Sequence, residues 1–148
     1  NAGQITKPLQ PAFLVRPASE QSNIAVSSAV TIVFGTEVFD QNADFASNTF
    51  TAPVTGRYQL SANIRLNNTD SASDYYRIEL NTSNRTYYQI FDPNFGQDAA
   101  FWTSTISVLV DMDASDTAIV KITQGGGTQQ TDIDANNGYT TFSGYLVA

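Results

Sequence analysis

Residues 58–66 alternate strictly between apolar and polar side chains. Because successive side chains of a β-strand point to opposite faces of the sheet, this period of two predicts a long strand that is buried on one face only. The segment before it contains Pro53, which lacks an amide donor, and Gly56, which permits a turn. Phe50 and Ala52 alternate with polar residues ahead of that turn, so the region indicates a strand, a turn and a second strand.

Apolar, β-branched and aromatic runs recur along the rest of the chain, between clusters of Gly, Pro, Asn, Asp and Ser. We expect strands over residues 12–15, 30–34, 75–80, 85–91, 101–110, 118–122 and 139–147. Residues 36–45 are expected to form a connection whose Val38 and Phe39 pack onto the core. No segment carries the apolar spacing of an amphipathic helix over three turns. Short strands with regularly spaced turn signals therefore predict an all-β sandwich or barrel.

The composition fits one compact domain. A chain of 148 residues with 41% hydrophobic residues can enclose a single core. No apolar run approaches the roughly 20 residues that a membrane helix needs, so membrane insertion is not expected. The polar residues 1–11 are interpreted as an N-terminal connector and residues 12–148 as a single domain. The formal net charge of -7, with only 7 Lys and Arg and no cluster of them, argues against a nucleic-acid partner.

The chain has no Cys and no His. This excludes disulfides, thiolate metal sites, Cys nucleophiles, Ser-His-Asp catalysis and His-ligated zinc. The acidic residues cluster in predicted loops, and none lies in an apolar stretch that would raise its pKa toward that of a general acid. We therefore expect a non-enzymatic protein with no catalytic residues.

Asn42 and Phe45, followed at residues 50–60 by Phe-Thr-Ala-Pro-Val-x-Gly-x-Tyr-x-Leu, resemble the central signature of the C1q-like domain. That domain is the globular head of the C1q and tumour-necrosis-factor superfamily. An Ala-Phe pair at residues 12–13 and Phe-Ser-Gly-Tyr-Leu at residues 142–146 stand in the order found in that family, with an Asp in a late loop between them. The resemblance runs from residue 12 to the last residue and implies a jelly roll of two antiparallel sheets.

Two turns depart from the family pattern. Ser47 and Asn48 replace the usual Thr-Gly, and Ser115 replaces the usual Gly before Asp116. These positions affect the shapes of loops more than the fold.

The resemblance also implies a homotrimer, in which an open sheet face of each subunit packs against its copies around a three-fold axis. Phe101, Tyr139 and Tyr145 are the candidate trimer-interface residues, because they fall on strand faces that remain outside the core. The alternative is that some of these rings only cover the ends of the sandwich.

Asp111, Asp113 and Asp116 form an acidic turn with the carboxylate spacing of a calcium loop. Asp132 and Asp134 offer a second pair of carboxylates for the six to eight oxygens that calcium prefers. The Gly at the sixth position of an EF-hand loop and its closing Glu are absent. A calcium site and a solvated acidic turn are both compatible with this pattern, and no cofactor is required.

Aromatic residues are denser between residues 75 and 102 than a core alone requires. Because adjacent strand residues face opposite sides, one ring of Tyr75-Tyr76 and one of Tyr87-Tyr88 should point outward. Exposed rings beside amides and carboxylates suit the recognition of carbohydrate or protein. The candidate ligand-binding residues are Tyr75, Tyr87, Asp92, Asn94 and Phe95. Packing against a neighbouring subunit is the alternative use of these rings.

Three classes of function remain for such a chain. The first is a trimeric recognition head that binds a cell-surface or extracellular protein or carbohydrate through the loops at residues 67–74, 92–97 and 125–137. The second is a structural cap that trimerises a stalk and has no ligand of its own. An enzyme is the third and has the least support. The domain is expected outside the cell, secreted or on a cell or virion surface, and its Cys-free, Thr- and Asn-rich composition suggests a bacterial or bacteriophage fibre protein.

Overall fold

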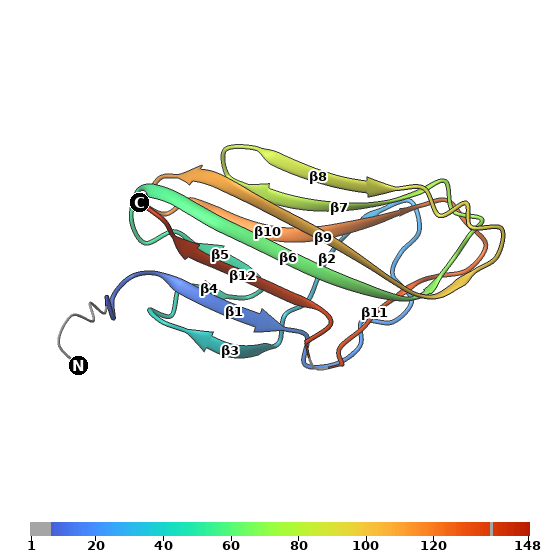
Figure 1. Cartoon of the computed structure of the whole chain (residues 1–148), viewed down its shortest axis with the longest axis horizontal. Coiled ribbons are helices and arrows are strands. Elements are labelled where there is room, and N and C mark those ends of the chain that lie inside the picture. Colours follow the sequence, from blue (N-terminus) through green and yellow to red (C-terminus); the bar gives the residue numbers. More distant parts are fainter. Residues whose placement is uncertain (1–6, 137) are drawn as a thin grey trace.

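The computed structural model describes residues 7–136 and 138–148. Within these residues the chain forms twelve strands and no helix (Figure 1). The strands are β1 (Ala12–Arg16), β2 (Ala29–Thr31), β3 (Thr36–Asp40), β4 (Phe45–Ala46), β5 (Thr49–Thr51), β6 (Gly56–Thr69), β7 (Tyr75–Thr82), β8 (Thr86–Phe91), β9 (Ala99–Met112), β10 (Thr117–Gly125), β11 (Asp132–Ile133) and β12 (Thr141–Leu146). No helix in the described part of the chain is long and apolar enough to cross a membrane.

The strands form two antiparallel sheets that pack face to face. In the first sheet β6 pairs with β9 along one edge and with β12 and β11 along the other, and β1 and β3 continue the sheet beyond β12. The second sheet has the order β4-β5-β10-β7-β8, with β2 also paired to β10. This arrangement confirms the predicted all-β sandwich, and it places the final strand centrally as expected.

Strand β6 carries the predicted alternation. Its inward side chains at positions 58, 60, 62, 64 and 66 are fully buried, and the side chains between them lie on the outer face of the first sheet. The strand extends beyond the predicted residues 58–66 at both ends, because β9 pairs with it from Gly56 to Thr69. The hairpin of β7 and β8 was also correctly predicted.

Aromatic rings from distant parts of the sequence fill the core. Phe13 stacks on Phe50 with ring centroids 4.7 Å apart, and it meets Phe142 edge-on at 5.0 Å. The buried Tyr58 donates a hydrogen bond from its hydroxyl to the Val54 carbonyl at 2.7 Å. The signature aromatic residues therefore lie in the core and hold the turn before β6 in place.

Strand β3 corrects one prediction. Residues 36–45 were expected to be a connection that packs Val38 and Phe39 onto the core, but residues 36–40 pair with β1 and both side chains are exposed. Phe39 is the register partner of Leu14, whereas the buried residues of β1 are Phe13 and Val15. Phe39 therefore belongs to the outer face of the first sheet.

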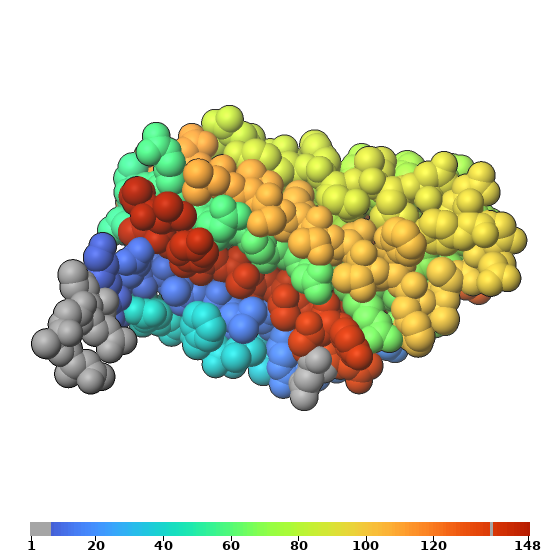
Figure 2. Space-filling model, viewed as in Figure 1, coloured from blue at the N-terminus to red at the C-terminus, as the bar shows by residue number. Residues whose placement is uncertain are grey.

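The loops gather at two opposite ends of the long strands (Figure 1). At the end that we call apical lie the loops around residues 70–74, 92–98 and 126–131. At the basal end lie the described N-terminal residues, the C-terminus and the loops around residues 53–55 and 113–116. Figure 2 shows β9, β6, β12, β1 and β3 side by side across the outer face of the first sheet.

The predicted connector covers residues 1–11, of which residues 1–6 lie outside the described residues. Residues 7–11 bind to the domain through several hydrogen bonds. The Asn42 side-chain amide donates to the Leu9 carbonyl at 3.0 Å, and the Leu146 backbone amide donates to the Pro11 carbonyl at 3.0 Å. Pro11 is buried.

Gly144→Ala tests the packing of β12 against the core. A Cβ at this position would overlap the Leu60 side chain and lie 2.8 Å from Phe13 Cε1. Because a filled core resists extra atoms, we expect the free energy of unfolding to fall by about 1–3 kcal/mol in urea denaturation. Ser143→Ala, one residue earlier on the opposite face, is the control and should change it by less than about 0.5 kcal/mol. Equal stability of the two variants would contradict this packing.

Candidate functional site

The three apical loops are joined by hydrogen bonds. The backbone amide and hydroxyl of Ser71 both donate to Asp98 Oδ1, at 2.9 and 2.7 Å, which links the loop after β6 to the loop before β9. The Asp74 amide donates to the Gly125 carbonyl at 2.7 Å, which links the first of these loops to the end of β10. The structure thus brings together loops that the sequence analysis proposed as a binding surface; residue 137 of that surface lies outside the described residues.

Asp70 is the buried anchor of this end. Its side chain accepts hydrogen bonds from the backbone amides of Ala72 at 2.8 Å, Gln129 at 2.8 Å and Thr128 at 2.5 Å. Burial raises the pKa of the Asp70 carboxyl, but the amides of Gln129, Ala72 and Thr128 lower it by more, so the pKa lies below its ordinary value. The ionised carboxylate therefore holds the two loops together.

A buried polar network continues from Asp70 into the sandwich. The Tyr76 hydroxyl accepts from the Asp70 amide at 2.9 Å and shares a 2.5 Å hydrogen bond with Thr131 Oγ1. Gln124 Nε2 donates to Ser73 Oγ at 3.0 Å, and Gln124 Oε1 accepts from the Thr131 amide at 3.1 Å. Because these polar groups are satisfied within the protein, they can be buried without a large penalty and they restrict the loops to one arrangement.

A pocket of about 430 Å³ lies beside this network, between the loop at residues 92–98 and the start of β9. It is lined by Phe95, Gly96, Gln97, Asp98, Ala99, Phe101 and Trp102. Phe95 and Trp102 stack at 4.7 Å and are 39% and 37% exposed. Trp102 also lies 5.1 Å from Phe91, which stacks on the buried Tyr76 at 5.1 Å. A column of rings thus runs from the core to the pocket wall.

The predicted ligand-binding residues divide into two groups. Phe95 lines the pocket, and the exposed Asp92 and Asn94 lie in the same loop, where the Asn94 amide donates to Asp92 Oδ1 at 2.9 Å. Tyr75 lies away from the pocket, with its ring against Gly125 on the outer face of the second sheet. The structure therefore brings together only part of the predicted set.

The pair at residues 87–88 has a definite orientation. Tyr87 is the register partner of the buried Leu80 and packs partly against the core, whereas Tyr88 is 60% exposed. Tyr88 is therefore the outward ring of this pair. Gln97 lies in the loop at residues 92–97 that was predicted to bind a ligand, and Trp102 lies in the predicted aromatic group, but neither was named as a binding residue. Asp98 was missed, and the Phe-Trp pair directly after a Gly-containing loop was the available signal for the pocket.

The three predicted interface rings lie on the outer face of the first sheet, with Phe101 opposite Asn67 and Tyr145 opposite Gln59 of β6. Phe101 is 62% exposed, Tyr139 49% and Tyr145 53%. The Arg65 guanidinium lies between two of these rings, 4.2 Å from the Phe101 centroid and 4.0 Å from the Tyr139 centroid. Arg65 Nε lies 3.3 Å from Oδ2 of the buried Asp134, so an ion pair fixes the stacked arginine from below.

The centre of this face is polar, and its side chains bond to one another. Thr105 Oγ1 donates to Asn63 Oδ1 at 2.6 Å, and the Asn63 amide donates to the Tyr139 carbonyl at 2.9 Å. Ser61 and Ser107 share a 2.7 Å hydrogen bond between their hydroxyls. A protein surface that covers this region therefore does not have to supply new hydrogen bonds to these side chains.

The acidic turn does not assemble the predicted calcium ligands. Asp111 lies 3.3 Å from the guanidinium of Arg85, and Asp116 accepts from the Asp113 amide at 2.8 Å. The described residues contain no group of three or more acidic side chains that could hold a metal ion. The turn follows Met112, which pairs with Gly56 at the start of β6, so the turn lies at the basal end of that strand.

The second acidic pair cannot complete the site. Asp132 pairs with Asn67 near the apical end of β6, whereas the acidic turn lies at the basal end. Asp132 accepts hydrogen bonds from the Asn23 amide at 2.7 Å and from Asn68 Nδ2 at 2.9 Å, and Asp134 pairs with Arg65. The expectation that the two acidic segments combine was wrong, because the length of β6 separates them.

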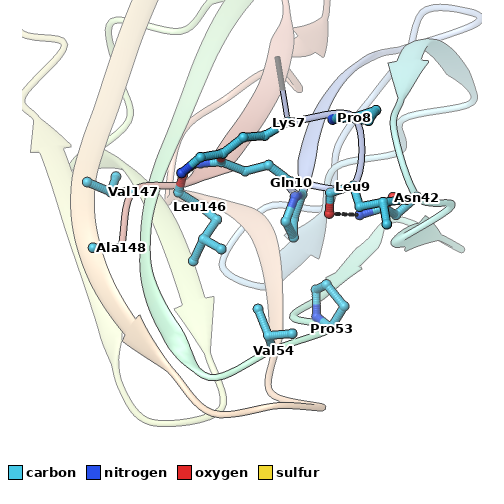
Figure 3. A pocket seen from close by; sticks show the side chains of 11 residues that line it. Lys7, Pro8, Leu9, Gln10, Asn42, Pro53, Val54, Leu146, Val147 and Ala148 are labelled. Atoms are coloured by element: carbon cyan, nitrogen blue, oxygen red, sulfur yellow. Dashed lines mark hydrogen bonds between the residues drawn. The ribbon is translucent and has the colours of Figure 1, made fainter. Parts of the chain in front are cut away.

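A groove of about 540 Å³ lies at the basal end (Figure 3). One wall consists of residues 7–11, and the C-terminal residues Leu146 and Val147 face it, with Pro53 and Val54 along another side. The lining is mainly apolar. The groove marks the place where the two ends of the described chain lie against each other, far from the apical pocket.

Known proteins share both the sequence pattern and the two-sheet architecture of this chain. The family model of the C1q domain matches residues 12–147. The globular domain of the zebrafish complement 1qA protein superposes with a TM-score of 0.63 at 17% identity, covering 94% of this chain and 98% of that one. Murine APRIL, in its crystal structure at pH 8.0, gives a TM-score of 0.69 at 12% identity, covering 93% and 99%. At these identities the structural similarity establishes the fold alone, a two-sheet jelly roll. No curated protein sequence matches the chain significantly.

The Asp70 network predicts acid-sensitive stability. Because the folded pKa of Asp70 lies below its unfolded value of about 3.9, its contribution is complete above that pH and disappears as the pH falls through the folded pKa. We expect Asp70→Asn to lower the free energy of unfolding by about 1–3 kcal/mol at pH 7, and the difference from wild type to shrink below about pH 4. Urea denaturation across this pH range measures both effects.

The exposed Asp92 provides the matched control for that experiment. Its carboxylate accepts one hydrogen bond from the Asn94 amide, so Asp92→Asn should change the free energy of unfolding by less than about 0.5 kcal/mol. A deficit of Asp70→Asn that stays the same at low pH would show that the ionised carboxylate is not what stabilises the loops.

Calcium is expected to have no effect on thermal stability, because each of the three carboxylates of the acidic turn already has a partner in the protein. A site occupied at about 100 times its Kd would add about 2.7 kcal/mol. Differential scanning calorimetry with calcium and with a chelator measures this difference. A calcium-dependent rise in Tm that Asp113→Asn abolishes would contradict this expectation and show that the acidic turn binds calcium.

Proposed function

Because the chain belongs to the C1q domain family, we propose that it is a non-enzymatic recognition head that assembles as a homotrimer and binds a ligand at its apical end. The observation that carries this proposal is the outer face of the first sheet. Five large apolar side chains on it are about half exposed or more: Phe39, Phe101, Leu109, Tyr139 and Tyr145. An exposed patch of this kind on a small domain favours an interface between proteins.

The form of this face suits self-association. Its rings surround a centre of Ser, Thr and Asn side chains that are already hydrogen-bonded within the subunit, so covering them costs little. Arg65 is held between two rings and against Asp134, which leaves the platform rigid before association. A rigid surface loses less conformational entropy when a partner covers it.

In the proposed trimer, the apical loops of the three subunits would form the ligand-binding surface. The apical loops lie at the end opposite the described N-terminal residues and the C-terminus (Figure 1). Three subunits around one axis would present three such ends in the same direction, which increases avidity for a cell-surface or extracellular protein or carbohydrate. The proposal includes an extracellular location, at the tip of a longer fibrous or secreted protein such as a bacterial or bacteriophage fibre.

A trimerising cap without its own ligand is the second candidate. It is favoured by the fact that Leu109 and Tyr145, which lie on the sheet face and outside the apical pocket, are more exposed than Phe95 and Trp102 in that pocket. Both candidates require the trimer, and only the recognition head requires a ligand at the apical end.

The oligomeric state tests the assembly. Light scattering should give a mass three times that of the 16.0 kDa chain. Tyr145→Asp should dissociate the trimer to monomers, because it places an unpaired charge at a ring position that the proposed contact would bury. Tyr88→Asp changes a ring of similar exposure on the second sheet and should leave the mass unchanged. A monomeric wild type, or trimers from both variants, would contradict the proposed interface.

A further inference from the structure

We infer that the apical pocket at Phe95 and Trp102 binds a pyranose ring of a neutral glycan. This inference rests on the proposed function, since it names the ligand class of the apical end. It follows from three features of the pocket: the geometry of its rings, the carboxylate fixed beside them and the absence of cationic side chains from its lining.

The rings form a platform rather than a cage. Phe95 and Trp102 are inclined by only 29° and stack on each other, and Trp102 is inclined by 33° to Phe91. Phe91 in turn lies nearly parallel to the buried Tyr76, at 10°. Rings that stack on one another cannot surround a ligand, but they present a fixed apolar surface. One face of a pyranose consists of C–H groups, and such a face packs against an aromatic surface.

The pocket also holds a polar partner in a fixed orientation. Both hydrogen bonds from Ser71 end on Asp98 Oδ1, and no hydrogen bond within the described residues ends on Oδ2. This oxygen can therefore accept a sugar hydroxyl without the side chain having to reorient. The neighbouring Gln97 amide supplies a donor and an acceptor at the same rim. A ring with hydroxyls around its edge matches a stacking surface bordered by these groups.

Charge and size narrow the ligand class. Asp98 is the one charged side chain among the pocket residues, so phosphate, sulfate and acidic sugars would meet a like charge in the lining. The Arg65 guanidinium behind Phe101 is stacked between Phe101 and Tyr139 and already paired with Asp134. The volume of about 430 Å³ lies within the range of about 300–1,000 Å³ typical of small-molecule sites. A short neutral saccharide fits these limits better than a folded protein surface does.

Trp102 makes the inference directly measurable, because it is the single Trp of the chain. A pyranose ring that stacks beside Trp102 is expected to change its fluorescence. The probes are methyl glycosides of glucose, galactose, mannose and N-acetylglucosamine and their di- to tetrasaccharides, titrated into the full chain to concentrations well above a Kd of about 1 mM. At least one should shift the emission saturably, and isothermal titration calorimetry should return the same Kd.

Two variants and one control locate the binding. Phe95→Ala removes part of the stacking surface, and Asp98→Asn keeps Oδ1 as an acceptor for Ser71 while removing the charge; each should weaken the affinity about tenfold. Tyr88→Ala removes an exposed ring on the second sheet and should leave the affinity unchanged. An affinity that neither pocket variant weakens would place the sugar elsewhere and overturn the inference.

Two further outcomes would overturn it. One is no response to any neutral saccharide, and the other is a response to choline alone, which would indicate a cation site. Light scattering on the same samples separates this inference from the proposed function. A trimer that ignores every saccharide would contradict only the glycan inference, whereas a monomer that binds a saccharide would contradict only the assembly.

Discussion

The pairing of β6 on both of its edges is the interaction on which the rest of the structure depends. β9 follows it from Gly56 to Thr69 on one side, and β12 and β11 share the other side. Because side chains alternate along a strand, this one strand contributes the buried residues between positions 58 and 66 and also the polar centre of the outer face. A slip of one residue in either ladder would exchange the core with the proposed interface.

The strands that the sequence predicted best are those in which local pattern and tertiary burial agree. The alternation at residues 58–66 needs no partner to be recognised, and Phe50 and Phe142 lie in the core as the signature implies. β3 was missed for the opposite reason. Its residues show no alternation of apolar and polar side chains. Residues 36–40 form a strand only because they pair with β1, in which Leu14, the partner of Phe39, lies 25 residues earlier in the sequence. A non-local ladder of this kind leaves no periodic trace in the sequence.

The positions of the candidate interface residues were predictable where the alternation of side chains along a strand decides which sheet face they lie on. Phe101 and Tyr145 share a face because their register partners, Asn67 and Gln59, lie on the same side of β6. The stacking of Arg65 was not predictable, since Arg65 itself, Phe101 and the connection that carries Asp134 and Tyr139 are three segments far apart in the sequence. The pocket likewise depends on a loop that folds back over Trp102, and no local pattern specifies such a return.

The two proposed surfaces meet at Phe101. Its ring lines the apical pocket and also stacks on Arg65, on the sheet face that self-association would cover. The other pocket ring, Phe95, is positioned instead by the column that ends in the buried Tyr76, whose hydroxyl belongs to the Asp70 network. One wall of the pocket is thus fixed by the fold of a single subunit, whereas the other lies where a neighbour would pack. Assembly that immobilises Phe101 would lower the entropic cost of stacking a ligand beside it, so the two surfaces are physically coupled through this ring.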